Sequence, residues 1–218
     1  MKIDLERVIV RLGAPAIAPG VAEVRMLPEH YFPHHWPETE QHLPVLSGEP
    51  GRRELCREDL FALGAAASGP EDMRNFYVAV CAWGAGTSAL SAYRLARPLA
   101  EPELEEHLWA GLRRAQRGDA LGAYEALSGE HRVRFLGPAF FSKLMHFMAP
   151  PPEVGDVRPP LILDSRVAQA LGWRKTASWS LAEYRAYLDA AEELRARWRP
   201  DLPLDVVEYQ LFAVGKQP

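Results

Sequence analysis

The chain has 218 residues, a mass of 24.4 kDa and a net charge of −4. Hydrophobic residues make up 48% of it and charged residues 25%, values that are typical of globular domains and exclude a disordered chain or a coiled coil. No apolar run reaches the roughly 20 residues that span a bilayer. The net negative charge excludes a surface that is basic throughout, as a uniform nucleic-acid coat would require, but it allows a local basic patch.

Residues 1–55 are rich in proline and show no sustained helical period. The β-branched run VIV predicts a short strand within residues 7–12. The opening MKIDLERVIVRLG has no apolar stretch of the kind that a signal peptide carries. We therefore expect an irregular N-terminal segment before the main helical part of the chain.

The apolar residues become helically spaced from residue 56 onward. The pattern predicts a helix in REDLFALGAAA, another in PEDMRNFYVAVCAWGAG that stops at Gly84 and Gly86, and a shorter one that ends before Pro98. A further helix in PELEEHLWAGLRRAQRG has acidic residues in its first turn and arginines in its last, as the helix dipole favours.

Capping residues mark the helices that follow. Asp119 is placed to cap a helix in DALGAYEALSG, and Ser180 with Glu183 forms a capping box before a helix of about five turns. LPLDVVEYQLFAVG predicts a final helix. We expect a mainly α-helical fold in which residues 1–218 form one domain, with a helical lobe over 56–128, catalytic helices over 129–218 and a cleft between two lobes.

The segment FLGPAFFSKLMHFM predicts a helix over residues 139–148 that is apolar except at Ser142, Lys143 and His146. These three positions share one narrow face, and a helix this apolar is mostly buried. The chain has only four lysines against 21 arginines, so a lysine here is notable. It must either extend to solvent or line a cleft, where burial disfavours its ammonium form and favours attack as a free amine. The pattern leaves both open.

Asp164 follows the apolar run LIL and precedes a helical pattern, so it occupies the N-cap position of the next helix. Capping is a sufficient explanation for an aspartate there. A carboxylate held rigidly at the end of a buried helix is also well placed to act on a cleft, and the two roles are compatible.

Together these residues resemble the helix-hairpin-helix superfamily of DNA glycosylases, in particular the 8-oxoguanine DNA glycosylases and their archaeal branch. The resemblance rests on a lysine on a buried helix, a proline-broken loop, an apolar run, and an aspartate that opens the next helix 21 residues after the lysine. LILDSRVA is similar to the aspartate segment of these enzymes, and the resemblance extends from Glu130 to the C-terminus. The chain departs from the family pattern in the hairpin before the lysine, where Gly137 replaces two closely spaced glycines.

The resemblance implies a DNA glycosylase with AP-lyase activity, for which 8-oxoguanine is the expected lesion. Lys143 would attack C1′ of the damaged nucleotide and form a Schiff base, while Asp164 would stabilise the cationic sugar and handle protons. No cofactor and no metal are implied. The expected partner is double-stranded DNA containing a damaged base, and the expected protein is a monomer without membrane association. Two cysteines, Cys56 and Cys81, are too few for a disulfide framework, which favours a cytoplasmic, nucleoid-associated location.

The resemblance also implies a base pocket and contacts with the DNA backbone. Glu208 and Phe212 are spaced i, i+4 on the final helix, where the family uses a polar side chain for the base edge and a phenylalanine for stacking. The family's polar residue is a glutamine, so Glu208 is a departure. Phe147, one turn after Lys143, is expected to form the opposite wall. The expected backbone contacts are Arg132, Arg134, Arg166 and Gly137.

Two other interpretations remain open. The segment HYFPHHWPETEQH carries potential zinc or iron ligands and would indicate a metal-dependent hydrolase, although it contains neither HExxH nor paired CxxC. Its candidate ligands are His30, His34, His35, Glu38, Glu40 and His42. The other interpretation is a non-catalytic helical DNA-binding module that retains a glycosylase-like scaffold.

Overall fold

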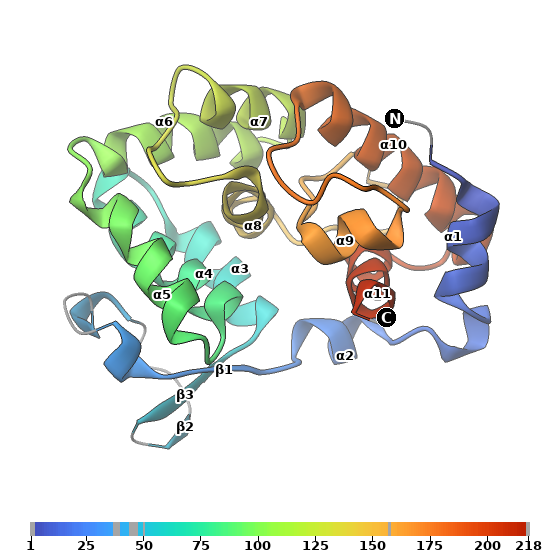
Figure 1. Ribbon diagram of the computed structural model, residues 1–218, viewed down its shortest axis with the longest axis horizontal. Coiled ribbons are helices and arrows are strands. Elements are labelled where there is room, and N and C mark those ends of the chain that lie inside the picture. Colours follow the sequence, from blue (N-terminus) through green and yellow to red (C-terminus); the bar gives the residue numbers. More distant parts are fainter. Residues whose placement is uncertain (1–2, 37–39, 44–47, 50, 157, 217–218) are drawn as a thin grey trace.

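The structure is a computed structural model that describes residues 3–36, 40–43, 48–49, 51–156 and 158–216, and it is mainly helical (Figure 1). The α-helices of this described part are α1 (Leu5–Leu12), α2 (Val21–Arg25), α3 (Arg57–Ala66), α4 (Met73–Ala85), α5 (Ala89–Ala96), α6 (Leu104–Gln116), α7 (Ala120–Ser128), α8 (Pro138–Met148), α9 (Ser165–Ala170), α10 (Leu181–Trp198) and α11 (Leu204–Gly215). A small antiparallel sheet has the strand order β1 (Glu29–Tyr31), β3 (Arg52–Leu55), β2 (Gly48–Glu49). No helix in the described ranges is long and apolar enough to span a membrane.

Helix α8 forms the centre of the fold and is seen almost end-on in the middle of Figure 1. It packs against α3, α4, α6 and α7, and its residues 141–148 are all buried. The contact with α3 is close because Gly64 has no side chain: a Cβ there would lie 2.0 Å from the carbonyl oxygen of Phe147. The apolar sequence of α8 is therefore explained by neighbours on every side, as expected for a helix without a continuous polar face.

Helices α9 and α11 form a second tightly packed pair, next to α8 in Figure 1. A Cβ on Gly215 of α11 would lie 2.0 Å from the carbonyl oxygen of Arg166 in α9, so the two backbones touch. Arg11 of α1 donates hydrogen bonds to carbonyl groups at the C-terminal ends of both helices. The last carbonyl groups of a helix lack the N–H donor of a following helical turn, and Arg11 supplies side-chain donors to such groups at both helix ends.

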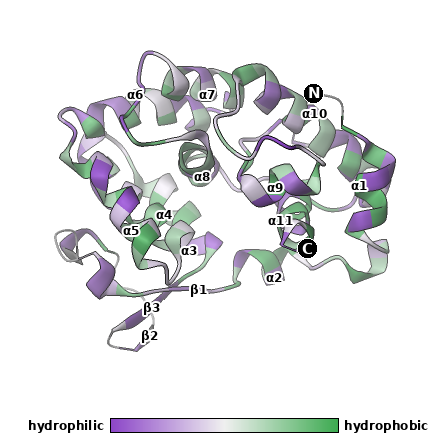
Figure 2. Ribbon diagram, viewed as in Figure 1, coloured by the Kyte–Doolittle hydropathy of each residue, from purple (hydrophilic) through white to green (hydrophobic). Residues whose placement is uncertain are grey.

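The largest hydrophobic cluster takes buried residues from α1 at one end of the chain to α11 at the other. Figure 2 shows hydrophilic and hydrophobic residues alternating along α6 and α10, as expected for helices with one face on the core. The helices predicted in the 56–218 part are confirmed, with Asp119 capping α7 and the Ser180–Glu183 capping box opening α10.

The N-terminal segment is more regular than its sequence predicts. Residues 7–12 belong to helix α1, so the predicted strand is wrong. Asp4 caps this helix by accepting a hydrogen bond from the backbone N–H of Arg7, and Val8 and Leu12 are buried one turn apart. The β-branched run favoured a strand only locally, and packing against α10 and α11 outweighs that preference.

Helix α4 does not stop at Gly84, as its sequence suggests, but continues to Ala85. Gly86 ends the helix with a positive φ of 55°, a conformation that favours glycine. Gly84 has a different function in the fold, because a Cβ there would lie 2.9 Å from Phe140 and 3.2 Å from Lys143. This glycine permits the close approach of α4 to α8.

Candidate active site

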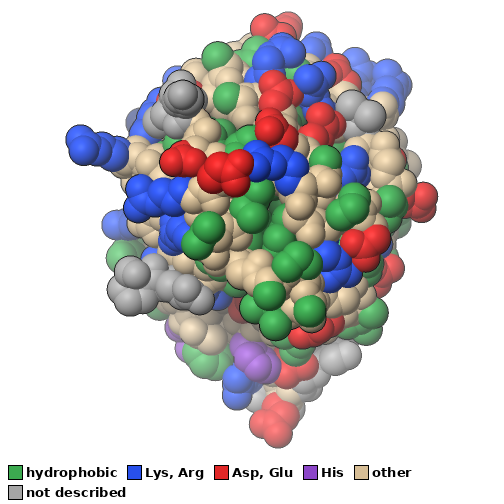
Figure 3. Space-filling model, turned by 90° about the vertical axis from the view of Figure 1, so that its right-hand side faces the viewer, with side chains coloured by type: hydrophobic (Ala, Val, Ile, Leu, Met, Phe, Trp, Pro, Cys, Tyr) green, Lys and Arg blue, Asp and Glu red, His purple; other side chains and the backbone are tan. Residues whose placement is uncertain are grey.

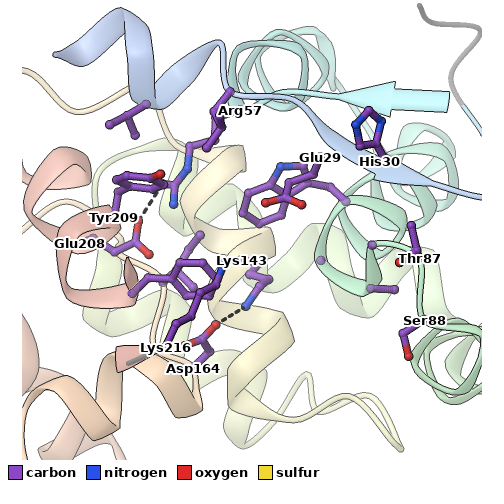
Figure 4. A pocket seen from close by; sticks show the side chains of 18 residues that line it. Glu29, His30, Arg57, Thr87, Ser88, Lys143, Asp164, Glu208, Tyr209 and Lys216 are labelled. Atoms are coloured by element: carbon purple, nitrogen blue, oxygen red, sulfur yellow. Dashed lines mark hydrogen bonds and ion pairs between the residues drawn. The ribbon is translucent and has the colours of Figure 1, made fainter. Parts of the chain in front are cut away.

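A pocket of about 480 Å³ lies between the ends of several helices, a volume suited to a small ligand (Figure 4). Its walls come from the α2–β1 segment, the start of α3, the end of α4 with the turn that follows it, α8, the segment before α9, and α11. Two ion pairs contribute to the lining, Lys143 with Asp164 and Arg57 with Glu208, and Figure 4 shows them as separate pairs.

Lys143 lies on the wall of this pocket and is only 6% exposed. Its Nζ donates to the carbonyl oxygen of Ala139 at 3.1 Å and to Asp164 Oδ2 at 3.3 Å. The Phe140 ring lies 5.2 Å away, from ring centroid to Nζ. Of the two alternatives that the sequence leaves open, the structure therefore selects the lysine that lines a cleft, and not one that extends to solvent.

Asp164 divides its two carboxylate oxygens between two functions. Oδ1 accepts hydrogen bonds from the backbone N–H groups of Arg166, at 2.9 Å, and Val167, at 3.1 Å, and thereby caps α9. Oδ2 faces Lys143. Burial favours a raised pKa for this carboxyl group, but the Lys143 ammonium and the capping hydrogen bonds outweigh it and lower the pKa below its usual value. The group is thus a carboxylate at neutral pH.

The extended segment 160–164 carries Asp164 into the pocket, and side chains of α8 and α10 bind its backbone. Ser142 is central, because its hydroxyl accepts from the N–H of Leu163 at 3.1 Å and donates to the carbonyl of the same residue at 3.4 Å. The other hydrogen bonds come from Tyr184 to Leu161, Tyr187 to Ile162 and His146 to Pro160. Because Ser142 and Leu163 precede Lys143 and Asp164 directly, this bond fixes the relative position of the ion pair.

Gly84 offers a test of how strictly Lys143 is held in place. We expect Gly84→Ala to slow any reaction in which Lys143 takes part about ten- to a hundredfold, because the new Cβ displaces Phe140 and the Lys143 side chain, and small displacements of a reacting group are costly. Helix propensity favours alanine, so the melting temperature should be kept. The measurement is the single-turnover rate of that reaction with a parallel thermal melt, and an unchanged rate would show that the lysine tolerates displacement.

A second buried ion pair lies elsewhere on the pocket lining. Arg57 Nη1 donates to Glu208 Oε2 at 2.7 Å and lies 3.4 Å from His146 Nε2. Burial raises the pKa of Glu208, although the adjacent guanidinium opposes this shift. Burial lowers the pKa of His146 to about 3, so the imidazole is neutral at physiological pH. Its Nδ1 then donates to the carbonyl of Pro160, and its Nε2 is an acceptor for Arg57.

Comparison with known protein families decides the identity of the chain. The family described as "Putative 8-oxoguanine DNA glycosylase OGG-like protein" matches residues 22–212. This range includes every pocket-lining residue except Lys216. The chain belongs to this family of OGG-like glycosylases. No curated protein and no solved structure matches it significantly. The protein is thus a DNA glycosylase of DNA repair, with DNA as its substrate.

Glu208 and Phe212 both line the pocket, as their shared helix face predicts. Phe212 is half-buried, and Lys216 Nζ lies 4.3 Å from its ring centroid. Phe147 does not lie where the sequence places it. It is fully buried behind the pocket, in edge contact with Phe61 and Trp83, because α3 and α4 cover this turn of α8. Trp83, and not Phe147, lines the pocket on that side.

The expected DNA-backbone residues are exposed but lie outside the pocket lining. Arg132 and Arg134 lie in the 129–137 loop between α7 and α8, which ends at Gly137, the N-cap of α8. Arg166 lies in the first turn of α9, next to Asp164. The face with α1 and α10, seen in Figure 3, mixes Lys and Arg with Asp and Glu and has no continuous basic surface.

The histidine-rich segment does not form a metal site in the described part of the chain. No group of three or more His, Cys, Asp or Glu side chains there is close enough to hold a metal ion. His34 and His35 contact each other, with ring centroids 4.4 Å apart, whereas His42 Nδ1 lies 2.7 Å from the Asn75 amide oxygen. His30 lies apart from them on the pocket lining, and Glu38 and the Glu40 side chain are outside the described residues.

Arg57, Trp83 and Tyr209 are among the pocket-lining residues that the sequence does not identify. Arg57 is an ordinary arginine in the first turn of a helix, and nothing nearby marks it as buried. Trp83 stands next to glycines that suggest a helix end, and Tyr209 follows Glu208 on a helix that is apolar on most sides. Each reaches the pocket through contacts between distant segments, so no local signal identifies it.

Proposed function

We propose that this glycosylase excises an oxidised purine, with 8-oxoguanine as the main lesion, and that it uses a Lys143 Schiff base that also provides AP-lyase activity. The observation that supports this most is the Lys143–Asp164 pair on the wall of a pocket large enough for a nucleobase. A free amine and a carboxylate are the two groups that this chemistry needs.

The proposed reaction begins when Lys143 loses its proton, for which Asp164 Oδ2, at 3.3 Å, is a suitable acceptor. The amine then donates its electron pair to C1′, and the bond from C1′ to the base breaks with its electron pair on the base. One proton of the attacking nitrogen passes to the departing base. Asp164 then gives its proton to the ring oxygen O4′ as the C1′–O4′ bond breaks, which forms the protonated imine with Lys143 and restores a carboxylate that stabilises its positive charge. Loss of a C2′ proton finally expels the 3′-phosphate and nicks the strand.

The base pocket of this proposal uses Phe212 for stacking and Glu208 for the base edge. Both line the same pocket as Lys143. The glutamate carboxylate accepts hydrogen bonds only, whereas the family's glutamine both donates and accepts. We therefore propose that Glu208 reads N–H groups of the base, in place of the mixed pattern of an amide.

Phe212→Ala should weaken binding to a lesion duplex about ten- to a hundredfold, because stacking of a base on an aromatic side chain contributes about 1–3 kcal/mol. Binding to undamaged duplex should hardly change, since phosphate contacts dominate that affinity. The measurement is a pair of binding isotherms at one salt concentration. Equal losses on both duplexes would mean that Phe212 only supports the fold.

The remaining expectations extend this proposal. We propose that Arg132, Arg134, Arg166 and the backbone at Gly137 contact phosphates, and that the chain acts as a monomer and a single domain over residues 1–218. Support for the single domain comes from the largest hydrophobic cluster, which joins the first and last helices. A DNA substrate favours action at the nucleoid in the cytoplasm.

A panel of duplexes with single defined lesions, incubated with the protein and borohydride, tests the proposed function. Borohydride reduces the imine, so a covalent complex with 8-oxoguanine duplex is the expected result. Excision without a trapped complex would leave a glycosylase without a lysine intermediate. Binding without excision of any lesion would instead indicate the non-catalytic DNA-binding module.

A further inference from the structure

Arg57 is a buried cation with unused hydrogen-bond donors at the edge of the pocket. The residue is 4% exposed and lines the pocket (Figure 4). Its contacts with Glu208 and His146 both use Nη1. No described residue accepts a hydrogen bond from Nε or Nη2. Neither nitrogen is among the enclosed side-chain atoms that lack a partner in the described part of the chain, so both are open to the pocket, where an acceptor on a bound ligand can reach them.

The surroundings hold this guanidinium in one orientation. Two aromatic rings flank it, with ring centroids 5.5 Å away for Trp83 and 5.8 Å away for Tyr209. The neutral His146 accepts from it and is itself fixed by its bond to the carbonyl of Pro160. The N–H donors of the Arg57 guanidinium are therefore held in a fixed orientation, as electrostatic stabilisation of a transition state requires.

Arg25 also pairs with a carboxylate of α11, and this ion pair serves as a structural comparison for Arg57. Arg25 Nε donates to Asp205 Oδ2 at 2.8 Å, and its Nη2 donates to the carbonyl of Pro152 at 2.6 Å. Two of its nitrogens are thus satisfied within the chain, and Arg25 does not line the pocket. The Nε and Nη2 donors of Arg57, by contrast, have no hydrogen-bond acceptor among the described residues.

We propose that Arg57 is a further catalytic residue, which donates hydrogen bonds to the extruded base and stabilises the negative charge that develops on it during excision. This inference rests on the proposed function. As the amine of Lys143 bonds to C1′, the bond between C1′ and the base breaks and its electron pair stays on the base. The proton that the attacking amine gives up balances this charge and ends on the base.

The ligand chemistry follows from the donors. A guanidinium fork suits a carbonyl oxygen or an anionic ring nitrogen, and the neighbouring Glu208 carboxylate suits an adjacent N–H. An oxidised purine offers a carbonyl next to an N–H along one edge. Within a partly desolvated site, one such preorganised donor typically contributes a rate factor of about 10²–10³.

Arg57→Gln tests this role, with two substrates that separate it from structural support. Excision of 8-oxoguanine in single turnover should fall at least about a hundredfold. Borohydride trapping on a duplex that already contains an abasic site should stay within about twofold of wild type, because that reaction has no departing base. Arg25→Gln, which removes the comparable pair outside the pocket, should leave both reactions near wild type.

The results that would overturn the inference are specific. Equal losses on lesion and abasic duplexes would make Arg57 structural, and unchanged excision would remove it from the reaction. Arg57→Gln leaves the buried Glu208 carboxylate without its partner and can fail to fold for that reason. In that case the double variant Arg57→Gln/Glu208→Gln is used, which has no such carboxylate. Its excision rate should fall below that of Glu208→Gln, and equal rates would remove Arg57 from the reaction. If wild type is not trapped on either duplex, the proposed function fails, and not this assignment alone.

Discussion

Lys143→Gln should abolish base excision and borohydride trapping while leaving the fold intact. Glutamine cannot attack C1′ or form an imine, so no covalent route remains. Its amide can still donate to Asp164 and to the Ala139 carbonyl, which the lysine contacts now. The expected result is excision at the background rate, no trapped complex and a melting temperature close to that of wild type.

Lys216→Gln is the matched control for this change. Lys216 also lines the pocket, over the ring of Phe212, but it is exposed and has no carboxylate partner within the described residues. We expect its replacement to leave trapping intact. A Lys143→Gln protein that still cross-links, or a Lys216→Gln protein that does not, would show that the nucleophile is assigned to the wrong residue.

Asp164→Asn should reduce turnover by a factor of about 10²–10⁴, the range for loss of a positioned acid–base group. Asparagine is a good N-cap residue, so its side-chain oxygen can keep the bonds to the N–H groups of Arg166 and Val167. The amide cannot accept a proton or stabilise a cationic sugar as the carboxylate does. The Asn variant should therefore lose activity and keep its stability.

Asp164→Ala removes both functions at once. Loss of an N-cap costs about 1 kcal/mol, which shifts the melting temperature of a chain of this size by roughly 2–4 °C. Comparing the two variants by turnover and thermal melts separates capping from catalysis. Wild-type activity in the Asn variant would leave Asp164 with capping alone.

The central helices and the places of Lys143 and Asp164 on them could be predicted because their signals are local. Ser142, Lys143 and His146 interrupt an otherwise apolar helix, and Asp164 stands before a helical pattern, so helical geometry gives their positions on these elements. That Lys143 and Asp164 belong to one site was implied by the family resemblance. Glu208 and Phe212 reach the same pocket for the same reason, since i and i+4 positions share a face.

Other parts depend on contacts that a single sequence does not reveal. Phe147 shares a helix face with Lys143, yet Gly64 lets α3 approach so closely that this turn is sealed from the pocket. Arg57 looks like a surface residue at a helix start, and only the fold brings it to Glu208. The β-branched run in α1 favours a strand locally, but its buried residues follow a helical spacing set by α10 and α11.

Peptide mapping of the borohydride-trapped complex tests the central claim most directly. The protein is incubated with an 8-oxoguanine duplex and borohydride, digested, and analysed by mass spectrometry for the peptide that carries the reduced sugar adduct. The account predicts one modified residue, Lys143, in the peptide that contains AFFSKLMHFM. An adduct on Lys216, on another lysine or on the N-terminal amine, with Lys143 unmodified, would contradict it.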